Sequence, residues 1–216
     1  MSAERDRFLA NEQHSEGVRA LAARGDLRRY RKGSILIQEG DTGDTMYILL
    51  EGRVKVYCTD ADDHEITFGV FGPGQYFGEM ALDGGPRSAS VVTLENCVCA
   101  VVTRVTLLAF IADRPEFVLE LLGQVIRRLR LATRDARNLA FIDVYGRLTQ
   151  CLQELATPQP DGTRRIDTRL THQEIASRVG CSREMVSRIL KDLESGGHLR
   201  RDERRIVLVG RLPQRW

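Results

Sequence analysis

The spacing of apolar residues along the chain changes from a helical period to a period of two and back again. Residues 1–25 place Val18, Leu21 and Ala22 at helical spacing, which predicts one short amphipathic helix. From about residue 27 to 110, short β-branched or aromatic runs alternate with polar positions and end at Gly, Asp or Pro. The expected strands are 34–38, 45–51, 54–59, 67–71, 90–93 and 98–103. So many short strands predict an antiparallel sandwich or barrel.

A long helix is expected after the strands. Asp113 can cap it, Pro115 suits its first turn, and Glu116 follows at the third position. The segment runs to about residue 139 and carries a heptad seam of Val118, Leu122, Val125, Leu129, Ala132, Ala136 and Leu139. Five arginines lie off the seam: Arg127, Arg128, Arg130, Arg134 and Arg137. We expect the seam to pair with a second copy as a parallel homodimer; the alternative is packing on the chain's own β domain.

A further helix and a terminal hairpin are expected in the last third of the chain. Asp143 can cap a helix over 144–156, and residues 157–162 contain the Pro and Gly of a loop. Near the end, the runs 199–201 and 205–209 are split by Asp202 and Glu203, which predicts a short hairpin.

Two short helices joined by a glycine-containing turn are expected between that loop and the hairpin. Thr171 and Glu174 have the spacing of a capping box, and Gly180 suits a left-handed turn residue. Ser182 can then cap a second helix over 183–193. With the hairpin as a wing, this order predicts a winged helix-turn-helix; the alternative is an ordinary helical core with surface arginines. The outer face of the second helix carries Arg183, Glu184, Ser187, Arg188 and Lys191.

Charge divides the chain into two unlike halves. Residues 1–120 hold 13 Lys and Arg against 19 Asp and Glu, whereas residues 121–216 hold 19 against 11. The net charge of the whole chain is +2. The basic half is therefore the one expected to meet a polyanion such as double-stranded DNA.

Composition excludes several classes of protein. No window approaches 18 uninterrupted apolar residues, so no membrane span is expected. The N-terminus is charged with both signs and lacks an apolar signal core, which favours the cytoplasm. The five cysteines form no C-x-x-C pair and no metal-ligand spacing with the four histidines, so no metal is expected. Cys97 and Cys99 are two apart in a strand and should share a buried face.

The segment 77–90 concentrates the chemistry of the first half. Arg87 offers a planar fork of donors to a phosphate, and the small residues beside it let an anion approach the main chain. Glu79 cannot bind a phosphate but can accept a hydrogen bond from a sugar hydroxyl. A phosphate binder and a sugar binder eight positions apart predict a nucleotide held without metal. The alternative is a tight turn with Arg87 in a surface ion pair.

This segment, Phe-Gly-Glu-Met-Ala-Leu followed by Pro-Arg-Ser-Ala, resembles the phosphate-binding cassette of cyclic-nucleotide-binding domains. The runs 138–144 and 179–191 are similar to the cyclic AMP receptor (catabolite activator) branch of the CRP/FNR transcription regulators. The resemblance implies an α+β chain with an antiparallel β jelly roll at 1–112, a dimerisation helix at 113–140 and a winged helix-turn-helix at 141–216. The nucleotide site that it implies comprises Gly78, Glu79, Met80, Arg87, Ser88, Ala89 and Thr133.

The same resemblance implies a dimeric, cyclic AMP-responsive regulator that binds a TGTGA-like palindrome and contacts RNA polymerase. Its DNA-binding residues would be Thr171, Ser182, Arg183, Glu184, Ser187, Arg188 and Lys191. Family members place two adjacent hydroxyl residues against the adenine, and here Ala132 replaces one of them beside Thr133. A response to cyclic GMP or cyclic di-GMP, or no ligand dependence at all, therefore stays open. The target genes, and whether binding activates or represses, do not follow from the sequence.

Three other functions are disfavoured. A cyclic-nucleotide module that gates a kinase or channel needs no DNA-reading domain, which residues 171–209 predict. A metalloenzyme on a similar β fold needs a His/Glu cluster, and His64 is the only histidine among the expected strands. A haem or oxygen sensor is disfavoured by the absence of clustered cysteines. We therefore expect no enzyme activity.

Overall fold

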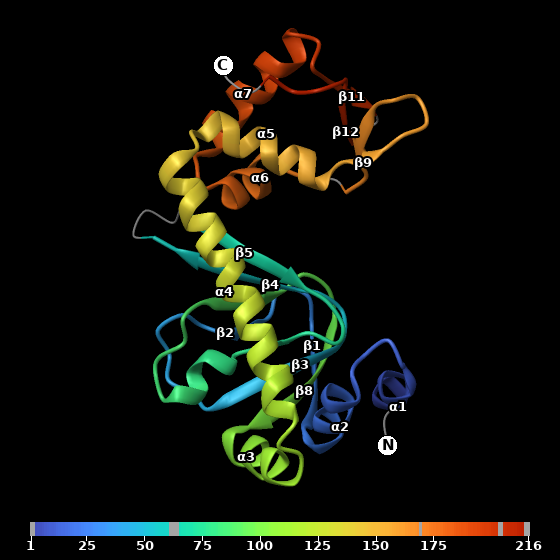
Figure 1. The fold of residues 1–216 in the computed structure, drawn as a ribbon, viewed down its shortest axis with the longest axis vertical. Coiled ribbons are helices and arrows are strands. Elements are labelled where there is room, and N and C mark those ends of the chain that lie inside the picture. Colours follow the sequence, from blue (N-terminus) through green and yellow to red (C-terminus); the bar gives the residue numbers. More distant parts are fainter. Residues whose placement is uncertain (1–2, 61–64, 169, 203–204, 214–216) are drawn as a thin grey trace. The chain divides into compact units, whose positions relative to one another are not determined.

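The computed structural model describes residues 3–60, 65–168, 170–202 and 205–213. The chain packs into two compact units. Unit 1 combines residues 1–58 with 67–128, and unit 2 combines 59–66 with 129–216. Figure 1 colours both along the chain.

Two four-stranded sheets form the frame of unit 1. The first, in the order β1-β8-β3-β6, contains β1 (Asp26–Tyr30), β8 (Cys97–Thr103), β3 (Thr45–Glu51) and β6 (Tyr76–Phe77). The second, in the order β2-β7-β4-β5, contains β2 (Ile35–Ile37), β7 (Ser90–Thr93), β4 (Val54–Thr59) and β5 (Glu65–Phe71). The strand pairs in unit 1 whose register is resolved run antiparallel, which confirms the predicted sheet class.

Two apolar clusters cover the two faces of the first sheet. One gathers Met46, Ile48 and Ala100 with residues of the helices that cover the sheet, including Phe110. The other gathers Leu49 and the cysteine pair with side chains of the second sheet. Cys97 and Cys99 are both buried in that second cluster, as their spacing predicted. Alternate residues of each central strand thus serve different clusters, which fixes the register.

The helices of unit 1 differ from the prediction at two places. The N-terminal stretch forms two helices, α1 (Ala3–Ala10) and α2 (Glu16–Arg24), because Ser15 caps the second one. The expectation of a long helix starting at Asp113 was wrong. Asp113 is the last residue of a separate helix, α3 (Arg104–Asp113), and it pairs with Arg24 at 2.8 Å.

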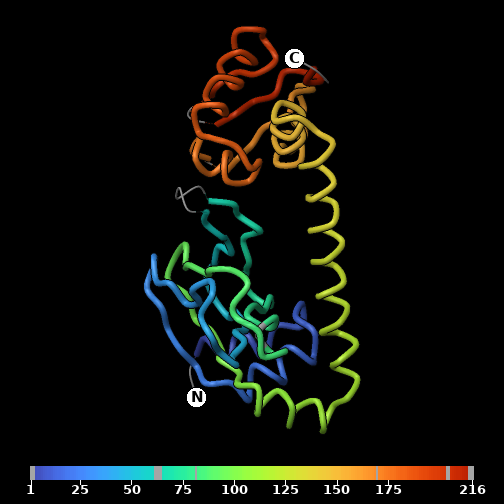
Figure 2. The backbone as a smooth tube through the Cα atoms, turned by 90° about the vertical axis from the view of Figure 1, so that its left-hand side faces the viewer, coloured from blue at the N-terminus to red at the C-terminus, as the bar shows by residue number. Residues whose placement is uncertain are grey.

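The long helix is present as α4 (Phe117–Phe141), the continuous rod of Figures 1 and 2. Apolar side chains of the predicted seam are exposed on it, with Leu129 63% exposed and Leu139 52%. Phe141, at its last position, is 83% exposed. Within the described residues, this apolar face of α4 is not covered by other side chains, and exposed apolar faces of this kind are typical of interaction surfaces.

Unit 2 is a helical core with a small sheet. Its elements are α5 (Val144–Leu155), β9 (Thr157–Pro158), β10 (Arg164–Ile166), α6 (His172–Val179), α7 (Arg183–Ser195), β11 (Leu199–Asp202) and β12 (Arg205–Leu208). The sheet order is β11-β12-β10-β9. The buried face of α7, formed by Val186, Ile189, Leu190 and Leu193, packs with α5 and α6 into one core. The predicted helix-turn-helix and wing are therefore confirmed.

Candidate functional site

The expected phosphate-binding segment is a tight bend that leads from β6 to β7. Gly78 follows β6 with φ of +84°, a conformation that favours glycine, and a 3-10 helix, η1 (Glu79–Asp83), comes next. A Cβ on Gly78 would lie only 3.0 Å from both Arg87 Nη1 and the Thr45 carbonyl oxygen. The main chain therefore approaches the Arg87 side chain at a distance that only glycine permits.

Arg87 is buried, with 8% of its surface exposed. Nη1 donates to the carbonyl oxygens of Thr45 and Gly78, each at 2.8 Å, and Nη2 donates to Thr45 Oγ1 at 3.0 Å. These acceptors are all neutral, and Arg87 makes no ion pair with any residue that the structure describes. The alternative of a surface ion pair therefore does not describe Arg87. A buried guanidinium without a carboxylate creates a strong demand for an anion.

Open polar space adjoins Arg87. A cavity of about 210 Å³ lies beside it, between β2 and β3. The polar lining comprises Gln38, Asp41, Thr42, Asp44, Thr45 and Arg87. The backbone holds this loop against the cassette, because Gly40 N donates to Arg87 O and Arg87 N donates to Asp41 O. The loop before β3 and the cassette thus position Arg87 together.

Glu79 is also buried, with 8% exposed, and it has a partner on α4. Arg128 Nη1 donates to Glu79 Oε1 at 2.5 Å, and Arg128 Nη2 donates to the carbonyl oxygen of Tyr76. The Arg128 guanidinium also lies over the ring of Phe71, 4.6 Å from its centroid. The sequence interpretation missed this role and placed Arg128 only among the arginines off the seam. The contact with Arg128 fixes the Glu79 side chain, whose oxygen atoms can accept hydrogen bonds.

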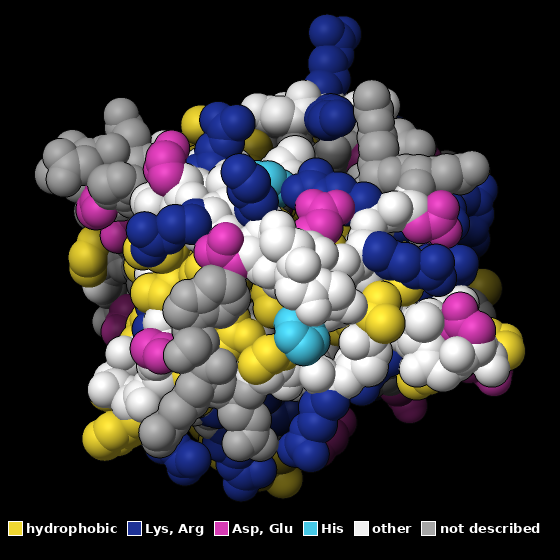
Figure 3. Space-filling view, turned by 90° about the horizontal axis from the view of Figure 1, so that it is seen from above, with side chains coloured by type: hydrophobic (Ala, Val, Ile, Leu, Met, Phe, Trp, Pro, Cys, Tyr) yellow, Lys and Arg dark blue, Asp and Glu magenta, His cyan; other side chains and the backbone are white. Residues whose placement is uncertain are grey.

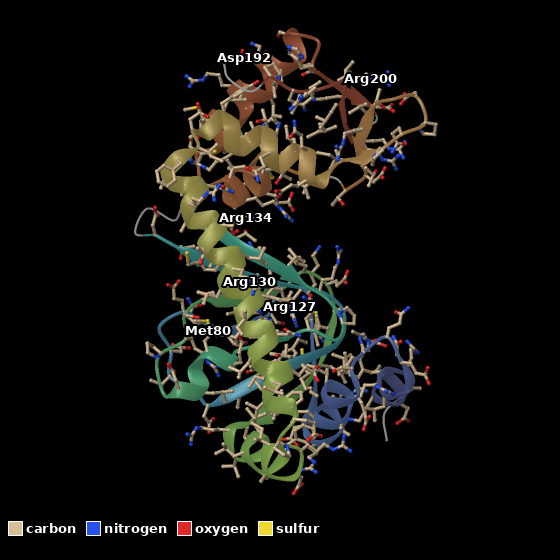
Figure 4. All side chains as sticks on the ribbon, in the orientation of Figure 1. Met80, Arg127, Arg130, Arg134, Asp192 and Arg200 are labelled. Carbon is tan, nitrogen blue, oxygen red and sulfur yellow. The ribbon has the colours of Figure 1, made fainter. Side chains whose placement is uncertain are left out.

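The other cassette residues lie nearer the surface. Met80 is exposed on η1 and is labelled in Figure 4. Ser88 is exposed, and its Oγ donates to Met80 Sδ at 3.3 Å. Ala89 is half-buried, followed by buried Ser90, whose Oγ accepts from Glu39 N at 3.0 Å. In the cassette, Glu79 and Arg87 are therefore buried, whereas Met80 and Ser88 are exposed.

Thr133 lies on the part of α4 that belongs to unit 2, whereas the cassette belongs to unit 1. Its Oγ1 donates to the carbonyl oxygen of Leu129 at 2.9 Å, one helical turn earlier. Both Thr133 and its neighbour Ala132 are exposed. The hydroxyl is therefore accessible on the helix surface.

The helix-turn-helix in unit 2 has the caps that the sequence predicted. Thr171 and Glu174 form a complete capping box at the start of α6, and Gly180 ends that helix with φ of +70°. Ser182 Oγ accepts from Met185 N at 3.2 Å and so caps α7. Each cap satisfies backbone N–H or C=O groups that the helix itself leaves unpaired. Local hydrogen bonds thus fix where α6 begins and ends and where α7 begins.

The expected DNA-reading side chains lie on the outer face of α7. Arg183, Glu184, Arg188 and Lys191 are exposed, and Ser187 is half-buried. Figure 3 looks onto the side where α7 lies and shows Lys and Arg side chains spread over it between a few acidic ones. Among the described residues, none of these four exposed side chains is held in an ion pair. Their charges are available to a partner.

A histidine links α6, α7 and the wing, and the sequence interpretation did not identify it. His172 Nδ1 lies 2.6 Å from Ser187 Oγ, and its Nε2 lies 3.3 Å from Arg201 Nη2 on β11. Burial, followed by the charges of Arg201 and Arg183, lowers the pKa of His172 below its ordinary 6.5. His172 is therefore mostly neutral at pH 7.

Arg147 on α5 holds the end of α4 to the turn between α6 and α7. Nη1 donates to the carbonyl oxygen of Ile142 at 2.8 Å, Nε to that of Val179 at 2.9 Å, and Nη2 to that of Gly180 at 3.3 Å. These carbonyls follow the last turns of α4 and α6, where helices leave carbonyl groups unpaired. Arg147 therefore satisfies two helix ends at once.

Metal-binding clusters and membrane-spanning helices are both absent from the described part of the chain. No three His, Cys, Asp or Glu side chains among these residues are arranged to hold a metal ion. None of the described helices is both long and apolar enough to cross a membrane.

Comparison with known families assigns both halves of the chain. Residues 27–114 match the cyclic nucleotide-binding domain, and residues 146–211 match the Crp-like helix-turn-helix domain. The first match contains the cassette and the second contains α6, α7 and the wing.

Individual proteins are similar over most of their length. The cAMP-activated global transcriptional regulator CRP of Haemophilus influenzae is 38% identical over 191 residues, which cover 85% of this chain and 84% of that protein. The CRP-like cAMP-activated global transcriptional regulator of Mycobacterium tuberculosis is 35% identical over 183 residues, covering 83% and 82%. Among solved structures, the c-di-GMP responsive global regulator CLP of Xanthomonas campestris has a TM-score of 0.79 at 31% identity, covering 91% of this chain and 100% of that one.

Proposed function

The chain belongs to the CRP family of transcription regulators, which are not enzymes, and we propose that it is a homodimer switched by cyclic AMP. It has a cyclic nucleotide-binding domain and a helix-turn-helix DNA-binding domain. In our proposal, residues 1–112 bind the nucleotide, 113–140 form the dimer and 141–216 read DNA. Because its target is chromosomal, we place it in the cytoplasm.

The buried guanidinium of Arg87 carries the ligand proposal. A cyclic phosphodiester brings one negative charge on a small group, which is what a buried guanidinium without a carboxylate partner requires. Its remaining N–H groups would donate to the phosphate oxygens, helped by Ser88 Oγ and the Ala89 main chain. Glu79 would accept from the ribose 2′-hydroxyl, while Arg128 holds the Glu79 side chain in place. Gly78 and Met80 complete the part of the proposed site that lies in unit 1, and Thr133 stays a predicted nucleotide contact from α4.

Cyclic AMP is favoured by the two similar regulators of Haemophilus influenzae and Mycobacterium tuberculosis, both of which are named cAMP-activated. A specific observation favours a second candidate, cyclic di-GMP. The similar CLP structure is named c-di-GMP responsive, and Ala132 here lacks a hydroxyl that would contact adenine. The charge of Arg87, which forms no ion pair within the described residues, matches a mononucleotide, which has one phosphodiester, so we place cyclic AMP first. Cyclic GMP and ligand-independent DNA binding rank below both cyclic AMP and cyclic di-GMP.

The exposed seam of α4 supports the homodimer. Leu122, Val125, Leu129 and Leu139 follow the heptad spacing and are all exposed. Pairing two such helices in parallel would bury these side chains, each contributing about 1.5–3 kcal/mol if fully covered. A dimer also supplies two helix-turn-helix domains, one for each half of a palindromic site.

The outer face of α7 supports recognition of a TGTGA-like half-site. Arginine can donate to guanine O6 and N7, and glutamate can accept from cytosine N4, so Arg183, Glu184 and Arg188 are the proposed base readers. The other proposed contacts, to phosphates, are those of Thr171, Ser182, Ser187 and Lys191. We propose RNA polymerase as a further partner without assigning its contact surface.

The switch follows from differential binding. Cyclic AMP shifts the protein toward the conformation to which the nucleotide binds more tightly. In our proposal, this conformation is also the one that binds DNA. The residues before Asp143, between the dimerisation helix and the DNA-binding domain, are the proposed hinge. Linkage then requires that operator DNA tighten nucleotide binding by the same factor.

The test is calorimetric titration of the purified protein with cyclic AMP, cyclic GMP and cyclic di-GMP, followed by operator binding with and without each. We expect cyclic AMP to bind and to tighten operator binding. Arg87→Ala should weaken nucleotide binding about 100-fold or more, because it removes several charge-assisted hydrogen bonds of about 1.5–3 kcal/mol each. Arg53→Ala is the matched control, since Arg53 is an exposed arginine of unit 1 paired with Glu95. Unchanged affinity in Arg87→Ala would refute the pocket.

A further inference from the structure

The protonation state of His172 can be read from its two partners. Arg201 has only donors, so the contact of its Nη2 with His172 Nε2 requires that Nε2 accept. The proton of the neutral ring is therefore on Nδ1, which donates to Ser187 Oγ at 2.6 Å. Ser187 uses an oxygen lone pair in this bond and keeps its own O–H as a donor. His172 thus orients the Ser187 hydroxyl on α7 and holds Arg201 of the wing.

Positive groups surround His172. Arg201 on β11 and Arg183 on α7 both act on the ring, whereas Ser187 on α7 is neutral. The nearest compensation for Arg201 is Glu194 on α7, whose Oε2 lies 3.6 Å from Arg201 Nε. On α6 itself, the carboxylate of Glu174 is engaged in the capping box with Thr171. Among the described residues, this corner of unit 2 thus brings two arginines near His172, while Glu194 and Glu174 already have partners.

We propose that His172, Ser187 and Arg201 form a binding site for one phosphate of the DNA backbone, and that His172 takes up a proton when the phosphate binds. This inference rests on the DNA-binding function proposed above. It adds His172 and Arg201 to the interface and makes operator binding proton-linked.

The chemistry of the site requires the proton. With neutral His172, the lone pair of Nε2 would face the phosphate oxygens, and Arg201 would stay bonded to Nε2. A proton from solvent on Nε2 breaks the Arg201–His172 hydrogen bond. Nε2–H, Arg201 Nη2–H and the Ser187 O–H can then all donate to the phosphate. Three donors and two cationic groups thereby replace one internal hydrogen bond.

The sign of the pH dependence follows. The arginines and burial lower the pKa of His172 in the free protein, whereas a bound phosphate would raise it. DNA affinity should therefore rise as the pH falls through the pKa of the complex and level off below the pKa of the free protein. Between these values one proton is taken up, so the affinity changes by at most about tenfold per pH unit.

The experiment measures binding of the full-length protein, saturated with cyclic AMP, to a fluorescent TGTGA palindrome between about pH 8 and about pH 5.5 at fixed ionic strength. His172→Gln cannot be protonated and should bind like the wild type at high pH but lose the gain at low pH. His172→Arg carries a permanent charge and should bind tightly with little pH dependence. His198→Gln, at the turn between α7 and β11, is the matched control and should keep the wild-type slope.

Three outcomes would overturn the inference. One is a wild-type affinity that does not change with pH. Another is a His172→Gln slope equal to that of the wild type. The third is an equal loss of affinity at every pH in both the Gln and the Arg variants, which would make His172 a merely structural residue. If the wild type binds no DNA at any pH, the DNA-reading proposal itself fails, and this result is distinct from an altered slope.

Discussion

Two arginines, one in each unit, make nearly the same hydrogen bonds but have different roles. Arg87 in unit 1 and Arg147 in unit 2 each donate three times, almost entirely to main-chain carbonyl oxygens. Neither forms an ion pair within the described residues. The difference lies in the origin of the carbonyls.

The acceptors of Arg147 stand at helix ends. Val179 and Gly180 end α6, and Ile142 follows the last residue of α4. Partial negative charge accumulates at such ends, so the guanidinium is compensated by the fold itself. The acceptors of Arg87 belong to β3 and to the bend after β6, where no helix ends. The number of hydrogen bonds therefore does not distinguish the two arginines. The backbone dipoles do: they compensate the charge of Arg147, whereas Arg87 still needs an anion.

Exchanging each arginine for methionine should separate the two roles most strongly. Arg147→Met should lower the free energy of unfolding by about 1–3 kcal/mol, because it leaves carbonyls at two helix ends unpaired. Arg87→Met should change the stability of the ligand-free protein by less than about 1 kcal/mol, because losing its hydrogen bonds is offset by removing a buried charge. Urea denaturation measures both.

Nucleotide titration of the same two proteins should give the reverse order, with binding lost in Arg87→Met and retained in Arg147→Met. A strongly destabilised Arg87→Met that still binds cyclic AMP would end the distinction drawn between the two arginines.

A change beside Arg87 should produce an intermediate effect. A Cβ on Gly43 would lie 2.7 Å from Arg87 Nη2, yet the backbone at Gly43 does not require glycine. Gly43→Ala should therefore displace the guanidinium and weaken nucleotide binding about tenfold, which corresponds to about 1.4 kcal/mol. Gly72→Ala is the control, because a methyl group at Gly72 would meet no atom within 4 Å. Equal affinities of the two variants would show that the tight approach of Gly43 to Arg87 does not matter.

The smallest effect is expected at the N-terminus of α6, whose C-terminal end is bonded to Arg147. Thr171→Ala removes the N-cap of α6 and should cost about 1 kcal/mol of stability. Thermal unfolding followed by circular dichroism measures it, with the exposed neighbour Gln173→Ala as the control. If Thr171→Ala destabilised the protein more than Arg147→Met, the N-terminal cap rather than the C-terminal arginine would be the main support of α6.

Local signals predicted the elements that carry their own start and stop residues. The strands β3, β4 and β7 match the expected ranges, and α6 and α7 follow their caps. Four strands were missed: β1, β6, β9, which lies in the expected loop 157–162, and β10, which follows that loop. β1 (Asp26–Tyr30) reads as charged because it is an edge strand paired only with β8, and β6 has just two residues. Helix α3 was missed because Thr103, which caps it, also ends a strand.

The site was predictable where its residues are contiguous in sequence. Glu79 and Arg87 lie in one segment, so their burial could be inferred before the fold was known. Arg128 is 49 positions from Glu79, and only the packing of α4 on the sheet brings them together. His172 and Arg201 are 29 positions apart and meet because the wing folds back beside α6. Contacts of this kind depend on tertiary structure and leave no trace in residue spacing.

The three bonds of Arg147 also have a mechanical meaning. They tie the main chain just beyond α4 to the turn between α6 and α7, so we expect these parts to move together. A rotation of the helix-turn-helix would then have to be accommodated before Ile142, where the side chain of Phe141 is exposed. The coupling between nucleotide binding and the orientation of the helix-turn-helix would thus depend on the stiffness of the last turn of α4 rather than on a flexible linker.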